Sequence, residues 1–518
     1  MSAVPIKYNP AFLSDAELAA AFVVRQNDLD SILRVVRDNT DESNQHVLVV
    51  GPRGIGKTML VRRASLAVRQ DAELSRKWYP LIFAEESYEV GTAGEFWLES
   101  LFHLANQTGD AQWLRTYEEL RDEPAEDRLH ERALAQLMDF ADRQGRRILL
   151  VVENLNMILG DQLRDADAWK LRKTLMHEPR VMLLATATAR LDGPANLQKA
   201  MYELFKTQPL HPLGDRDCQA VWRSVAGHDP GLRRIRAIRI LTGGNPRLLA
   251  VMAHFGARMS FSELMQDMTS LVDDHTDYFK SHLDALPATE RKVYVALADL
   301  WDPATARAVA TAARQSVSQT SAMLKRLVSR GAVSESPGTG RAKRYQVTDR
   351  MYNFYYLMRR RGGPSERVKL MIQLMVQFYG EIRYKTAEIE PQSDQAWHVL
   401  DAGSESVHTQ VCGLLQAGRS DEALAIAAKL LQNREWVAAK VEDMVALFAE
   451  LVAAGLTAKA LALLGESPSA EVLEPILVAL KMELGTGIHV APEIAEVAGD
   501  VRKRFEEVRA RRSRKRGG

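Results

Sequence analysis

Short runs of apolar residues alternate with helical patterns over the first part of the chain, up to about residue 210. HVLVV (46–50), ILLVV (148–152) and the stretch 181–190 are mostly apolar or β-branched, which is typical of strands buried in a parallel sheet. TMLVRRASLAVRQ, shortly after the first run, has apolar residues at helical spacing. The pattern predicts a parallel αβα sandwich over residues 1–210.

The pattern changes after this region. We expect a helical lid over 211–285, and then three short helices and two β-prone runs around a Pro-Gly-Thr-Gly turn, which predict a winged helix-turn-helix over 286–362. Beyond it the pattern is helical, and AGRSDEALAIA is repeated as AGLTAKALALL at an interval of 37 residues. Residues 363–500 are therefore expected to form tetratricopeptide-like hairpins or, alternatively, an irregular helical cap. The fold class is multidomain α/β plus α.

Composition is that of a folded protein, because 46% of the 518 residues are hydrophobic and 26% are charged. The net charge of +1 hides two basic segments. Residues 287–361 hold 14 basic against 5 acidic residues, and 502–518 hold 9 against 2. We expect the second segment, within a tail from residue 501, either to bind nucleic acid through its phosphates or to be a solubilising end.

The two cysteines, Cys218 and Cys412, lie far apart without metal-ligand spacing, so neither a disulfide framework nor a zinc site is expected. No apolar stretch approaches the roughly 18 residues that span a bilayer, and the N-terminus lacks the pattern of a signal peptide. We therefore expect a cytoplasmic protein.

A phosphate-binding loop follows the first strand. GPRGIGKT has the glycines that let successive N–H groups point inward at a helix N-terminus, where phosphate charge is stabilised. Lys57 can reach the β and γ phosphates, and Thr58 offers a hydroxyl to Mg²⁺. The order of strand, glycine loop and helix predicts that the chain binds Mg-ATP. The loop residues expected at the nucleotide are Gly51, Pro52, Arg53, Gly54, Ile55, Gly56, Lys57 and Thr58.

A carboxylate at the end of the strand 148–152 completes the expected magnesium site. Glu153 is predicted to hold Mg²⁺ through water, although it could instead be a solvated residue at a strand end. Asn154 stands where many such ATPases have the Glu that polarises the attacking water, and an amide cannot be a general base. Glu85 and Glu86 could supply a base if the strand before them lay beside the loop strand; a solvated loop is the alternative. Hydrolysis is thus predicted less firmly than binding.

Three more residues are candidate sensors of the nucleotide. Thr186, in the strand from Val181, could contact the γ-phosphate from the carboxyl edge of the sheet, and Arg190 could do so as a cation within the molecule or across a subunit interface. Arginines that follow strands are also commonly solvated. TGGNPRLLA predicts a turn and a helix with Arg247 in its first turn, from which Arg247 can report nucleotide state through a lid.

Four segments, FVVRQNDLDSIL, GPRGIGKT, VVEN and GGNPR, together resemble the AAA+ ATPases of the initiator-loader group and the related STAND and archaeal-type ATPases. The resemblance covers roughly residues 10–360 and implies an ATPase core and a helical lid followed by a winged helix. It implies that Phe22, Val23 and Arg25 lie near the adenine and that Arg247 is the second sensor. Glu153-Asn154 departs from the usual acidic pair, which implies slow turnover or a switch driven by nucleotide exchange.

The basic winged helix has two alternative roles. In its third helix, Ala322, Leu324, Leu327 and Val328 are predicted to pack inward. The residues expected to contact DNA, from that helix and from the wing, are Ser318, Gln319, Lys325, Arg341, Lys343 and Arg344. Winged helices also serve as packing or protein-contact modules. Tyr352, Phe354, Tyr355 and Tyr356, in the closing segment, are expected in the core rather than stacked on bases.

Two functions follow from these patterns. The first is an ATP-controlled switch that holds duplex DNA. The second is a STAND-like signalling or scaffold ATPase whose C-terminal helices bind a protein partner and whose nucleotide state governs assembly into homo-oligomers. A metabolic kinase is disfavoured because nothing after the glycine loop indicates a pocket for a small substrate.

Overall fold

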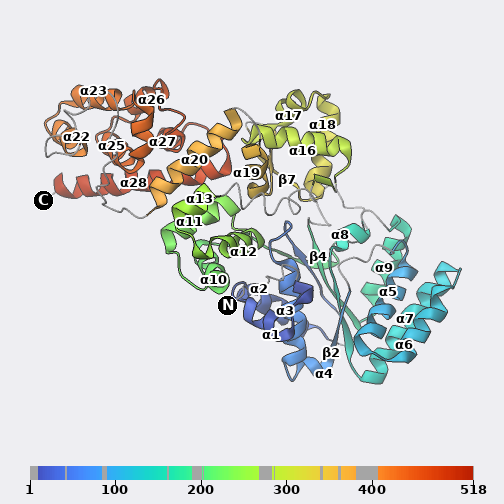
Figure 1. The fold of residues 1–518 in the computed structure, drawn as a ribbon. Coiled ribbons are helices and arrows are strands. Elements are labelled where there is room, and N and C mark those ends of the chain that lie inside the picture. Colours follow the sequence, from blue (N-terminus) through green and yellow to red (C-terminus); the bar gives the residue numbers. More distant parts are fainter. Residues whose placement is uncertain are drawn as a thin grey trace. The chain divides into compact units, whose positions relative to one another are not determined.

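The structure, a computed structural model, describes residues 10–40, 42, 44–83, 90–159, 163–188, 201, 203–267, 283–284, 286–338, 342–359, 363–380 and 407–516. The chain divides into two compact units (Figure 1). The first comprises residues 1–224, 245–250 and 328–332, and the second comprises 225–244, 251–327 and 333–518. Each unit is described by itself.

A five-stranded parallel sheet forms the centre of the first unit. Its strands are β1 (His46–Val50), β2 (Trp78–Ile82), β3 (Arg147–Val152), β4 (Val181–Ala187) and β5 (Phe205–Pro209), in the order β2-β3-β4-β1-β5. Three of these strands are buried along their whole length, because both faces of the sheet are covered by helices. Val50, the last residue of β1, is in register with Ala187 and Pro209. The carboxyl ends of β4 and β5 therefore flank the start of the glycine loop.

Helices cover both faces of this sheet, as the αβα prediction requires. α2 (Gln26–Asp38) and α3 (Lys57–Gln70) pack on one face, and α5 (Ala93–Thr108), α7 (Glu126–Gln144) and α9 (Asp165–His177) lie on the other (Figure 1). Alternate strand residues serve the two cores: Val49 and Val151 face α2 and α3, whereas Leu48 and Leu150 face the opposite helices. The remaining helical segments are η1 (Pro10–Phe12), α1 (Asp15–Ala21), α4 (Leu74–Lys77), α6 (Ala111–Arg121), α8 (Leu155–Met157) and α10 (Asp215–Ala226).

The strand order contradicts the prediction that Glu85 or Glu86 could lie close enough to the glycine loop to supply a base. β2 lies at the edge of the sheet and pairs with β3, and two strands, β3 and β4, separate it from β1. The strand that precedes Glu85 and Glu86 is therefore not beside the loop strand. The condition under which either glutamate could supply a base is not met. Both glutamates lie outside the described residues.

Helices α11 (Leu232–Thr242), α12 (Pro246–Phe255) and α13 (Phe261–Gln266), with η4 (Gly256–Arg258), occupy the expected lid region. α16 (Ala288–Leu300), α17 (Ala306–Ala313) and α18 (Val317–Ser329) follow, and then the antiparallel hairpin of β7 (Val333–Pro337) and β8 (Lys343–Val347), with the short β6 (Ala304–Thr305) paired to β8. This is the order of elements predicted for residues 286–347, which we call the hairpin module.

The inward face of α18 differs from the prediction by part of a turn. Thr320, Leu324 and Leu327 are buried, whereas Ala322 is exposed and Val328 is only half-buried. Positions 320, 324 and 327 share one helical stripe, so the small Thr320 side chain takes the inner position that was assigned to Ala322. Tyr352 and Phe354, in α19 (Arg350–Arg359), are fully buried, which confirms their assignment to the core.

The C-terminal region is helical throughout the described residues. After α20 (Gly363–Tyr379) come α22 (Val407–Gln416), α23 (Ser420–Leu430), α24 (Arg434–Ala439), α25 (Val441–Ala453), α26 (Thr457–Gly465) and α27 (Glu474–Glu483). Contacts recur at the predicted interval of 37 residues or one more: Arg434 pairs with Glu471 at 3.2 Å, Lys459 pairs with Asp421 at 3.1 Å, and the hydroxyl of Ser469 donates to the carbonyl of Leu431 at 2.7 Å. Residues 37 or 38 apart thus lie side by side, as in stacked hairpins.

The expected tail from residue 501 is instead part of a long helix. α28 (Pro492–Arg516) packs on α25 and α27, and its Val501 and Phe505 are fully buried. Arg502 and Arg509 both bond to Glu483, at 2.8 and 2.5 Å. Apolar residues at 501 and 505 anchor one face of the helix, so the boundary drawn at residue 501 falls inside a packed element. Among the described residues, no helix is both long enough and apolar enough to cross a membrane.

Candidate nucleotide site

The glycine loop connects β1 to α3 through conformations that suit glycine. Gly54 and Gly56 have φ angles of +77° and +98°, in the left-handed region, and α3 begins directly afterwards at Lys57. A Cβ atom on Gly54 would lie 2.7 Å from the side-chain oxygen of Asn245. The loop thus runs without side chains at Gly54 and Gly56 directly into a helix N-terminus, which is the arrangement that binds phosphate.

Lys57 is held at the base of this loop. Its side chain is buried, and the ammonium group donates to the carbonyl oxygens of Gly51 at 2.7 Å and Pro52 at 3.1 Å. These two bonds fix the ammonium next to the loop. The predicted phosphate ligand thus lies where its charge can act on an anion in the loop.

Thr58 and Glu153 come together as the sequence predicted. The Thr58 hydroxyl donates to Glu153 Oε2, and Arg62 Nε donates to Glu153 Oε1 at 3.3 Å. Glu153 is buried at the end of β3, so it is not the solvated residue of the alternative interpretation. A hydroxyl and a carboxylate in contact beside a phosphate loop are hard oxygen ligands that suit Mg²⁺.

Asn154 and Thr186 are also neighbours. Asn154 has φ +52°, a left-handed conformation that asparagine tolerates better than most residues, and its backbone N–H donates to Thr186 Oγ1 at 3.0 Å. Thr186 is buried. Its hydroxyl accepts this bond and keeps its own proton to donate elsewhere.

The segment before α2 contacts the loop from another side. Arg25 donates to the carbonyl oxygens of Ile55 at 3.0 Å and His211 at 2.8 Å, and burial lowers the pKa of its guanidinium despite the neighbouring Asp28. Phe22 is buried in the core beside α3, whereas Val23 is 39% exposed. Arg25 therefore helps to fix the shape of the loop, while the adenine contacts implied by the resemblance stay a prediction.

The segment 245–250 belongs to the first unit and bonds directly to the loop. Asn245 donates from its side-chain amide to the carbonyl of Arg53 at 3.0 Å, and the backbone N–H of Arg247 donates to the carbonyl of Gly54 at 3.3 Å. Asn245 Oδ1 also accepts from the N–H of Arg247 at 3.0 Å, where α12 begins. Arg247 lies in the first turn of α12 as predicted, and its side chain is exposed.

The residues predicted to contact DNA divide into two groups. Ser318, Gln319 and Lys325 are exposed on α18. Lys343 instead pairs with Glu335 at 2.9 Å, which raises its pKa, and the half-buried Arg344 donates to the carbonyl of Pro303 at 2.9 Å. Arg341 and Arg190 lie outside the described residues. Within the hairpin module, the helix thus offers more accessible polar groups than the described part of the wing.

Two residues at the site were not predicted. Arg62 stands four positions after Thr58 on α3, so helical periodicity could have placed it on the same face. Asn245 stands inside the GGNPR segment, two residues before Arg247. Its side chain both begins α12 and bonds to the loop, a double role that depends on tertiary contacts.

Residues 21–184 match the family described as AAA ATPase domain. Among the curated proteins, none matches this chain in sequence. Solved structures that match it include the Walker-type ATPase of Pyrococcus abyssi (TM-score 0.43, 11% identity, 64% of this chain and 95% of that one) and the Orc1 protein of Aeropyrum pernix in complex with DNA (0.39, 14%, 68% and 95%). Cdc6p of Pyrobaculum aerophilum also matches (0.36, 11%, 70% and 98%). The match to an AAA ATPase domain thus covers residues 21–184, which include the glycine loop, Glu153 and the helices on both faces of the sheet.

Proposed function

We propose that this protein is a nucleotide-operated switch that binds Mg-ATP in the loop 51–58 and transmits the occupied state through the segment 245–250. One observation carries the proposal: Asn245 and Arg247 bond to the carbonyl oxygens of Arg53 and Gly54, in the middle of the loop. A change in the loop backbone would therefore alter the start of α12.

The residues present fit the nucleotide and its metal. Lys57 and the N–H groups of the loop would hold the phosphates, and Thr58 with Glu153 would hold Mg²⁺, directly or through water. Bound Mg²⁺ supplies charge neutralisation to the phosphates. Arg62 balances the charge of Glu153 and keeps one carboxylate oxygen in place. Thr186 can donate its proton toward the terminal phosphate.

Slow turnover fits this arrangement better than vigorous hydrolysis. Asn154 cannot accept a proton as a carboxylate does, and its backbone bond to Thr186 links the two strand ends instead. The pair is suited to sensing the phosphate. We therefore expect nucleotide exchange, more than hydrolysis, to set the state of the protein.

Duplex DNA is the proposed target of the switch. Ser318, Gln319 and Lys325 are exposed on α18, the third helix of the hairpin module, and such a helix can enter the major groove. Phosphate contacts from this basic region would make the affinity fall with salt.

ATP turnover with and without duplex DNA tests the proposal, with Glu153→Gln as the control variant. We expect slow turnover that changes when DNA is added, and none in Glu153→Gln. A parallel DNA titration of the ATP-bound protein should show salt-sensitive binding. Absence of any DNA binding at low salt would refute the DNA target while leaving the nucleotide switch intact.

A protein partner is the second candidate target, and the register of the C-terminal helices favours it. Contacts such as Lys459 to Asp421 join residues 38 apart, which supports a stack of hairpins, and such stacks commonly offer an extended binding surface. Size measurements with ATP, with ADP and without nucleotide test this alternative. A monomer in all three conditions that captures no partner would contradict it.

A further inference from the structure

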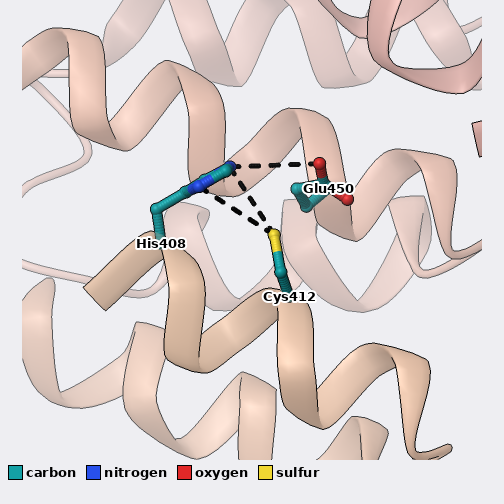
Figure 2. Close-up of side chains that lie close together, drawn as sticks. All are labelled: His408, Cys412 and Glu450. Carbon is teal, nitrogen blue, oxygen red and sulfur yellow. Dashed lines mark hydrogen bonds and ion pairs between the residues drawn. The ribbon is translucent and has the colours of Figure 1, made fainter. Parts of the chain in front are cut away.

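Folding brings together three possible metal ligands in the second unit. His408 and Cys412 lie on α22, and Glu450 lies on the neighbouring α25 (Figure 2). A spacing of four residues places His408 and Cys412 on the same face of their helix. We propose that these three side chains bind a zinc-class divalent cation that joins α22 to α25.

The distance between His408 and Cys412 matches that between two ligands of a tetrahedral metal ion, and Glu450 lies slightly farther away. His408 Nε2 lies 3.6 Å from Cys412 Sγ and 3.9 Å from Glu450 Oε1, and the three ligand atoms lie within 4.8 Å of one another. Zn–N and Zn–S bonds of about 2.1 and 2.3 Å at the tetrahedral angle separate nitrogen and sulfur by about 3.6 Å. His408 Nε2 faces both other ligands, so one ion can contact all three after small side-chain movements.

The chemistry of the three groups selects the metal. A thiolate with an imidazole and a carboxylate suits Zn²⁺ and its close relatives, whereas Mg²⁺ and Ca²⁺ prefer oxygen ligands only. Thiolate and carboxylate together neutralise the two charges of the ion. The site supplies three protein ligands, which leaves a fourth position for water or another group.

A nearby arginine orients the carboxylate. Arg512, on α28, lies 3.8 Å from Glu450 Oε2 and donates to the backbone carbonyls of Glu450 at 3.4 Å and Leu415 at 3.3 Å. It therefore contacts the oxygen that faces away from His408 and leaves Oε1 toward the imidazole. Partners that orient a metal ligand in this way commonly raise metal affinity.

The site is accessible but not fully exposed. The side chain of His408 is 41% exposed and that of Glu450 is 19% exposed, and the Cys412 thiol is reduced. An ion can reach the ligands from solvent, and it would then hold two hairpins of the C-terminal region together. The proposal is independent of the nucleotide switch, since all its residues lie in the second unit.

Metal titration of the full chain tests the proposal. After removal of metals by a chelator, Zn²⁺ is added in competition with a chromophoric chelator, and Co²⁺ is added separately to look for a thiolate-to-cobalt charge-transfer band. We expect one bound ion per chain, the thiolate band, and a higher Tm with Zn²⁺. Cys412→Ser should weaken Zn²⁺ binding by at least about 100-fold and abolish the band.

Two further variants keep the test decisive. Glu450→Gln should weaken Zn²⁺ binding while keeping the thiolate band, because the cysteine and histidine are still present. His489→Asn, which changes an exposed histidine of the same unit, should behave as the wild type. Equal Zn²⁺ affinities of the wild type and Cys412→Ser, or a Co²⁺ complex without the thiolate band, would overturn the proposal.

Discussion

The glycine loop and the basic segments of the second unit both concentrate positive charge, but they use it differently. At the loop, Lys57 is buried against the carbonyl oxygens of Gly51 and Pro52. In α28, Arg502 and Arg509 bond to the carboxylate of Glu483, whose lowered pKa reflects these two bonds acting against the opposing effect of burial. Lys57 thus bonds to the loop backbone itself, whereas the two arginines of α28 pair with a carboxylate at the end of α27.

This difference shows that the net charge of a segment does not identify a binding site. Residues 502–518 carry one of the densest basic runs in the sequence, yet much of its described part stabilises helix packing. Two of the eight residues of the glycine loop are basic, Arg53 and Lys57, and the Lys57 ammonium lies against the loop backbone. What matters is where the fold places each cation and which groups it contacts there.

The largest effect should come from Gly54→Val at the loop. A β-branched residue is strained at φ +77°, and its Cβ would collide with Asn245. We expect ATP affinity to fall by at least about 100-fold, which corresponds to about 2.7 kcal/mol, measured by calorimetric titration. Gly109→Val is the matched control, because Gly109 has φ +66° with open space around it. If both variants bound ATP like the wild type, the role of the loop shape would be wrong.

Falling pH should destabilise the first unit before it affects the second. Burial lowers the pKa of His46, in β1, to about 4. As pH falls below about 6.5, this histidine is therefore protonated in the unfolded chain but stays neutral in the folded unit, which favours unfolding. We expect the first unit to lose about 2 kcal/mol of stability between pH 7 and pH 5. In the second unit, bonds from Arg350 and Arg239 lower the pKa of Glu496 against the effect of burial, so its contribution persists until pH falls below about 4.5.

Hydrogen exchange across this pH range measures the two units separately. His46→Gln should remove most of the acid sensitivity of the first unit, because glutamine has no proton to gain there. Exchange that accelerates equally in both units at pH 5, or an unchanged acid response in His46→Gln, would contradict the assignment.

Asn245→Ala should have a moderate effect on the contact between the loop and α12. It removes the bond to the carbonyl of Arg53 and the side-chain cap at Arg247 N–H, which costs about 1 kcal/mol of local stability. We expect ATP affinity to fall several-fold and hydrogen exchange of residues 245–250 to accelerate. Asn433→Ala, which removes an equivalent cap from α24, should leave ATP binding unchanged. Equal ATP affinities of the wild type, Asn245→Ala and Asn433→Ala would show that Asn245 has no part in the switch.

The smallest expected effects are on DNA binding, when either an exposed lysine or a paired lysine of the hairpin module is replaced. Lys325→Ala should weaken DNA binding a few-fold and reduce the dependence on salt by about one phosphate contact. Lys343→Ala should change it less, because Glu335 already neutralises Lys343. Fluorescence titrations at several salt concentrations measure both. A larger loss in Lys343→Ala would show that the wing, rather than α18, carries the contact.

Local patterns predicted the glycine loop and the elements around it well. HVLVV and GPRGIGKT specify a buried strand, a glycine loop and a helix, and the strand ending at Glu153 brought that carboxylate to Thr58. These features depend on residues close in sequence and on the rule that parallel strands end at one edge of the sheet. The edge position of β2 depends on long-range pairing, which the sequence pattern does not encode locally.

Tertiary partners explain the remaining differences. The pairing of Lys343 with Glu335 needs the hairpin register, and the packing of Phe505 needs α25 and α27 in place. Glu450 reaches His408 only because two hairpins stack, so the cysteine spacing alone gave no sign of a metal site. The spacing of His408 and Cys412 is visible in the sequence, but it is too common in helices to predict one.

Equilibrium binding of ATP in the presence of Mg²⁺ tests the central claim most directly, with wild type compared to Lys57→Ala. Lys77→Ala, at an exposed lysine of the same unit that pairs with Glu73, is the control. The wild type and the control should bind one ATP with similar affinity, and Lys57→Ala should bind at least about 100-fold more weakly. Tight ATP binding by Lys57→Ala would contradict the account.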